Sequence, residues 1–112
     1  MTNEITFRGM DPSPAAEAEI TRCIIRVRDT YERITRCDVV VEQPHRHHRQ
    51  GKVFHVRIEV TIPGGVINVS RDPGTDHAHE DLYAAIADAF RAARRQLQGY
   101  AEQRRGDVKL HA

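Results

Sequence analysis

Two groups of side chains in this sequence have chemistry that could serve a functional site. One is a set of five histidines in two polar segments, and the other is a set of arginines spaced along two amphipathic stretches. Clustered imidazoles can bind zinc or nickel. Arginine forks bind phosphate bidentately, so regularly spaced arginines favour a partner with regularly spaced phosphates. The two groups therefore point to a metal site or to a nucleic-acid interface.

The histidines lie in the polar segments QPHRHHRQG and DPGTDHAHED, and they are His45, His47, His48, His77 and His79. Arg46 and Arg49 lie in the first segment and Lys52 directly follows it, and we expect these basic residues to form a second RNA contact. No nucleophile–base motif accompanies the histidines, so we expect no catalysis, no cofactor and no enzyme. We favour solvated or RNA-contacting histidines over metal ligands. A metal-binding module that uses these loops is the alternative.

The arginines are arranged on two predicted helices. Apolar residues at three- and four-residue steps predict one helix of about six turns, from a Ser13 cap and Pro14 to Ile34, and a second helix from Leu82. At about 100° per residue, the arginines fall opposite each apolar stripe. They are Arg22, Arg26 and Arg33 on the first helix and Arg91, Arg94 and Arg95 on the second. Acids precede the arginines on both helices, and the helix dipole accounts for part of this order.

Four stretches with strand patterns surround these helices. They cover residues 4–9, 37–42, 53–62 and 66–71, and the turn Pro63-Gly64-Gly65 joins the last two. The order β-α-β-β-β-α predicts an α+β fold, a four-stranded mixed sheet with two helices on one face. A right-handed crossover makes the first two strands parallel, and the rest follow as a meander. Both helices then start at the same end of the sheet and run parallel.

Length and composition limit what these elements can form. The chain has 112 residues, 39% of them hydrophobic, which predicts one globular domain over 1–106 and a short flexible tail over 107–112. The formal net charge is only +1, so any electrostatic argument must rest on local charge. Cys23 and Cys37 lack zinc-ligand spacing and are expected to be reduced and buried. No signal pattern or long apolar run is present, so we expect a cytoplasmic protein without membrane contact.

Two segments resemble a known family. The opening ITFRGM and the helical DLYAAIADAFRAARRQL are similar to the ribosome hibernation-promoting factor and ribosome-associated translation inhibitor family in its short form. The similarity covers residues 4 to about 105. It implies a double-stranded-RNA-binding-like fold, and it implies that Arg91 and Arg95, with Arg26 and Arg33, contact ribosomal RNA.

The resemblance also implies a function. Such proteins bind the small ribosomal subunit, occlude the messenger and transfer RNA sites, repress translation and stabilise inactive ribosomes under stress or in stationary phase. The sequence departs from the family in its near-zero charge and in its histidine-rich loops. The C-terminal dimerising domain of longer members is also missing, so we expect no ribosome pairing by that route. A generic structured-RNA-binding protein is a further alternative, and no small-molecule substrate is expected.

Overall fold

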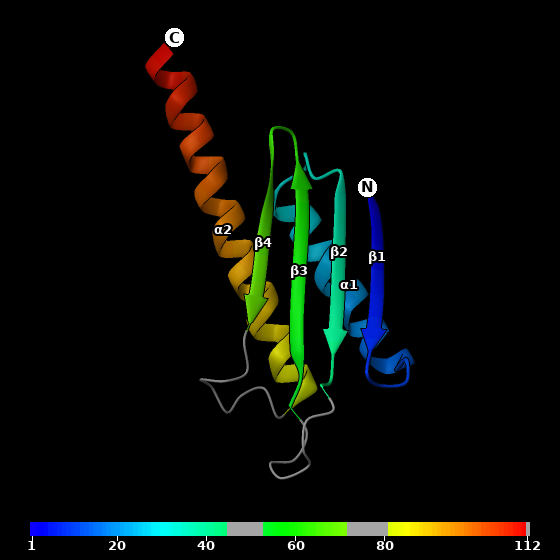
Figure 1. The fold of residues 1–112 in the computed structure, drawn as a ribbon. Helices are drawn as coiled ribbons and strands as arrows, with labels where there is room; N and C mark the ends of the chain where they lie inside the picture. Colours follow the sequence, from blue (N-terminus) through cyan, green and yellow to red (C-terminus); the bar gives the residue numbers. More distant parts are fainter. Residues whose placement is uncertain (45–52, 72–80, 112) are drawn as a thin grey trace.

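The computed structural model describes residues 1–44, 53–71 and 81–111 (Figure 1). The elements follow the predicted order, as β1 (Thr2–Arg8), α1 (Pro14–Thr30), β2 (Arg36–Glu42), β3 (His55–Ile62), β4 (Gly65–Arg71) and α2 (Leu82–His111). The strands form one mixed sheet in the order β1-β2-β3-β4. β1 pairs parallel to β2, and the remaining pairs are antiparallel. The predicted α+β fold is confirmed.

Both helices cover the same face of the sheet and run in the same direction (Figure 1). The alternation of side chains along β3 creates this two-layer arrangement, because Val56, Ile58 and Val60 are buried while Arg57 and Glu59 are exposed. The apolar side chains of both helices pack against this buried face of the sheet. The most buried of them include Ile20 and Ile24 of α1 and Ile86 and Leu97 of α2. Burying each such side chain stabilises the fold by about 1.5–3 kcal/mol.

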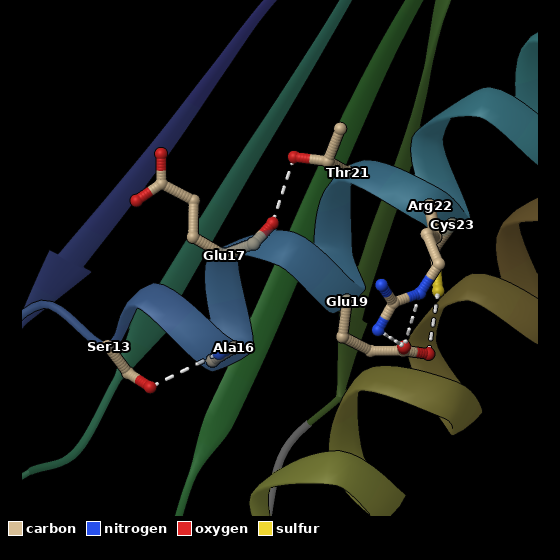
Figure 2. Close-up of polar contacts among 7 residues, drawn as sticks. All are labelled: Ser13, Ala16, Glu17, Glu19, Thr21, Arg22 and Cys23. Atoms are coloured by element: carbon tan, nitrogen blue, oxygen red, sulfur yellow. Dashed lines mark hydrogen bonds and ion pairs between the residues drawn. The ribbon is translucent and has the colours of Figure 1, made fainter.

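α1 begins as predicted and ends earlier than predicted. The Ser13 hydroxyl accepts a hydrogen bond from the Ala16 amide at 3.2 Å (Figure 2). Tyr31 is extended, at φ −146 and ψ 109, and ends the helix after Thr30. The prediction of a helix through Ile34 is therefore wrong. Ile34 lies in the connection to β2 and is buried in the core, so an apolar residue at a helical spacing did not mean that the residue is helical.

α2 is longer than its apolar pattern suggests. The Asp81 carboxylate accepts a hydrogen bond from the Tyr83 amide at 2.9 Å and so caps the first turn. The backbone stays helical through Gly106 to His111, and the last part of the helix extends past the sheet (Figure 1). Within the described residues, neither helix is long and apolar enough to span a membrane.

Gly9 fixes the end of β1 beside the end of β2. Its φ of 71 lies in the left-handed region, and a Cβ at this position would come within 2.3 Å of the Gln43 carbonyl oxygen. The Gln43 amide also donates to the Arg8 carbonyl at 2.9 Å. Only glycine permits this close approach, which explains its place in the motif ITFRGM.

Candidate nucleic-acid interface between the two helices

A groove of about 200 Å³ lies between α1 and α2 on the side away from the sheet. α1 lines it with Glu19, Cys23 and Arg26, and α2 lines it with Ala87, Phe90, Arg91 and Arg94. The groove exists because small or apolar side chains form its floor, with Phe90 and Cys23 buried beneath longer side chains. Guanidinium groups from both helices are thus brought together at one site.

On the α1 side, an ion pair holds Arg22 against its own helix. Arg22 donates to one oxygen of Glu19 through Nη2 at 2.7 Å and through Nε at 3.1 Å (Figure 2). The Cys23 thiol lies 3.8 Å from the other oxygen and donates to it. The hydrogen bond from Arg22 is the main cause that lowers the pKa of Glu19 below its ordinary value, so this carboxylate is ionised at neutral pH.

The α2 side has the same construction. Arg91 donates to the Asp88 carboxylate through Nη1 at 2.7 Å. One turn later, Arg94 is half-buried at the groove and Arg95 is exposed outside the groove lining. Within the part of the chain that the structure describes, no carboxylate pairs with Arg26, Arg94 or Arg95. The guanidinium groups of these three arginines are therefore available to bind an anion.

The opposite face of the sheet is different, because its charges compensate one another. Arg36 lies 2.8 Å from Asp38 and 3.7 Å from Glu4, and Arg57 lies 4.0 Å from Glu42. The described side chains of α2, by contrast, include four arginines and only two acids. Within residues 1–44, 53–71 and 81–104, the excess of arginines over acids thus lies on α2 and not on the exposed face of the sheet.

Of the predicted contact residues, the structure brings Arg26, Arg91 and Arg94 together in the groove, while Arg22 and Arg95 are exposed on the same two helices outside its lining. Arg33 is exposed but lies beyond the end of α1, so its predicted place on the helical row is wrong. The remaining predicted contacts fall outside the described residues, and they are His45, Arg46, His47, His48, Arg49, Lys52, His77 and His79. The flanking ends of β2, β3 and β4 lie at one end of the sheet, since Glu42 pairs with His55 and Val56 with Arg71.

Sequence reasoning missed the roles of Glu19 and Asp88. Both are acids three residues before an arginine, a helical spacing that brings the two side chains together. The spacing of three residues is visible in the sequence, but the position of the acids before the arginines was attributed in part to the helix dipole and not to ion pairs.

Metal ligation finds no support in the described residues, where no group of His, Cys, Asp or Glu has the geometry to hold an ion. The two cysteines are free and buried, as predicted. Burial raises the pKa of Cys37 to about 11 and also raises that of Cys23, so both thiols are neutral at pH 7.

Comparison with known proteins then decides the family. The model of the Sigma 54 modulation protein / S30EA ribosomal protein family matches residues 3–105. The chain belongs to this family. The similarity to hibernation factors that ITFRGM and the second helix indicated is thereby confirmed.

Two solved structures share the fold. A ribosomal subunit interface protein from Coxiella burnetii has a TM-score of 0.71 at 20% identity, and the match covers 91% of this chain and 99% of that one. The Protein Y N-terminal domain from Thermus thermophilus has a TM-score of 0.67 at 21% identity, covering 87% and 94%. No curated protein sequence matches this chain significantly.

Proposed function

We propose that this protein binds the small ribosomal subunit through ribosomal RNA and represses translation by occluding the messenger and transfer RNA sites. The observation that carries the proposal is the convergence of Arg26, Arg91 and Arg94 on one groove in a chain of the S30EA family. The similarity to a ribosomal subunit interface protein supports the same partner. Ribosomes held in this way would be stabilised in an inactive form under stress or in stationary phase.

The chemistry of the groove favours structured RNA over unpaired bases. Its aromatic residue, Phe90, is only 3% exposed and cannot stack on a base. Guanidinium groups above it can reach phosphate oxygens on both sides of the groove. Recognition is then by the shape and charge of a folded RNA backbone, as is usual for paired RNA.

Occlusion requires binding and no reaction. The protein acts by filling a site, so its inhibition should be stoichiometric with ribosomes and should not turn over. A protein that acts on ribosomes works in the cytoplasm, in agreement with the expectation from the sequence.

Competition on purified small subunits tests the proposal. Labelled protein is added to subunits at rising salt, and initiator transfer RNA and messenger are then added in excess. We expect tight binding that weakens by orders of magnitude between about 50 and 200 mM salt, because several phosphate contacts release counterions. We also expect initiator transfer RNA to displace the protein. Binding that is unaffected by excess transfer RNA and messenger would contradict occlusion.

A further inference from the structure

Both helices carry an acid that is paired with an arginine three residues later. Glu19 binds Arg22 on α1 and Asp88 binds Arg91 on α2, in each case at 2.7 Å and at a spacing of three residues. An unpaired arginine follows about one turn later on each helix, as Arg26 and as Arg94. α2 thus lines the groove with the paired Arg91 and the unpaired Arg94, and α1 lines it with Glu19 and the unpaired Arg26, while Arg22 lies outside the lining.

The two carboxylates are well placed to compete with an incoming phosphate. Glu19 and Asp88 are only 30% and 25% exposed, whereas their arginines are 61% and 59% exposed. The acids thus lie close to the helices, and the guanidinium groups that they hold face solvent. A phosphate that approaches Arg22 or Arg91 must share or displace a carboxylate that is already in contact.

We propose that Glu19 and Asp88 limit the affinity for RNA by competing with phosphates for Arg22 and Arg91. This inference rests on the proposed function. Arg26, Arg94 and Arg95 are free to bind any phosphate, but Arg22 and Arg91 become available only when the ion pairs open. An RNA surface that contacts all the arginines at once compensates for opening both pairs, and an arbitrary duplex does not.

Neutral substitutions of the two acids test this role. Glu19→Gln with Asp88→Asn keeps the size of each side chain and an oxygen acceptor while removing both charges. The matched control is Asp11→Asn with Glu17→Gln, which removes the same charge from exposed residues outside the groove. Figure 2 shows that Glu17 and Glu19 project from opposite sides of α1. Circular dichroism establishes that all variants remain folded.

The readout is fluorescence anisotropy with two RNA targets, an unrelated RNA hairpin and purified small subunits. Exposed ion pairs of this kind correspond to about a two- to fivefold effect each. We therefore expect Glu19→Gln with Asp88→Asn to bind the hairpin about five- to twentyfold more tightly, with a steeper salt dependence. Affinity for small subunits should rise at least as much, because the wild-type complex with subunits includes the cost of opening both ion pairs. The control should change hairpin affinity by about twofold or less, since salt screens distant charges.

Two results would overturn the inference. If Glu19→Gln with Asp88→Asn binds the hairpin only as tightly as the control does, the acids do not compete with phosphate. If this double variant binds the hairpin more weakly, the acids position the arginines for contact. Failure of the proposed function is seen separately, as wild-type protein that does not bind small subunits at low salt.

Discussion

The ring of Tyr31 meets the ring of Tyr100 edge-on, with centroids 5.9 Å apart and planes at 81°. This contact joins the residue that ends α1 to the second half of α2. The Tyr100 hydroxyl also donates to the Pro63 carbonyl oxygen at 3.1 Å, which ties α2 to the turn between β3 and β4. The Arg104 guanidinium carbon lies 5.9 Å from the centre of the same ring. Tyr100 therefore connects three parts of the fold at the end opposite the start of both helices.

A double-mutant cycle should detect this aromatic contact. Tyr31→Leu and Tyr100→Leu are each expected to lower the free energy of unfolding, and the cycle should give a coupling of about 0.5–1.5 kcal/mol beyond burial. Urea denaturation of the wild type, both single variants and the double variant provides the four values. Additive effects would mean that the edge-on geometry contributes nothing.

Two glycines should respond oppositely to the same substitution. Gly9→Ala places a Cβ against the Gln43 carbonyl in a left-handed conformation, and we expect it to destabilise the fold by about 1–3 kcal/mol. Gly99→Ala lies within α2 with open space around the new Cβ and should stabilise by about 0.5–1 kcal/mol. Urea midpoints measure both changes. Equal shifts in one direction would refute the assigned role of Gly9.

The buried thiols should be protected and should make stability depend on alkaline pH. In the folded protein the pKa of Cys37 is about 11, above its ordinary value of 9.0, so folding favours the protonated form. This contribution is fully present below pH 9 and is lost as the pH rises toward 11. Cys37→Ala should therefore show a smaller fall in the free energy of unfolding over that interval. Iodoacetamide should also modify Cys37 much faster in denaturant than in native protein at pH 8, and fast native modification would contradict the burial.

The sequence predicted the layers better than the ends of the helices. Alternation along residues 53–62 and the Pro63-Gly64-Gly65 turn indicated the meander correctly, because one face of β3 is buried and the other is wet. The end of α1 was missed because buried Ile34 continues the helical spacing by chance from a non-helical connection. Arg33 was misplaced for the same reason.

The site was predicted in part. The spacing of the arginines placed them on the outward sides of both helices. The groove, however, depends on how α1 and α2 pack against each other, and the periodicity of a single helix does not predict that packing. Arg22 and Arg91 are already paired with neighbouring acids, which lowers the contribution to RNA binding that we expect from them. Arg26, Arg94 and Arg95 therefore become the stronger candidates for RNA contact.

Sedimentation of ribosomes with charge-reversed protein tests the central claim most directly. The groove variant carries Glu at Arg26 and Arg94, which line the groove, and at Arg95, which is exposed next to Arg94 on α2. The control carries Glu at Arg8, Arg28 and Arg57, which are exposed arginines outside the groove, so both variants change net charge equally. In sucrose gradients at low salt, we predict that wild type and control migrate with small subunits while the folded groove variant stays at the top. Co-migration of the groove variant at wild-type levels, or equal loss by both variants, would contradict binding through the groove.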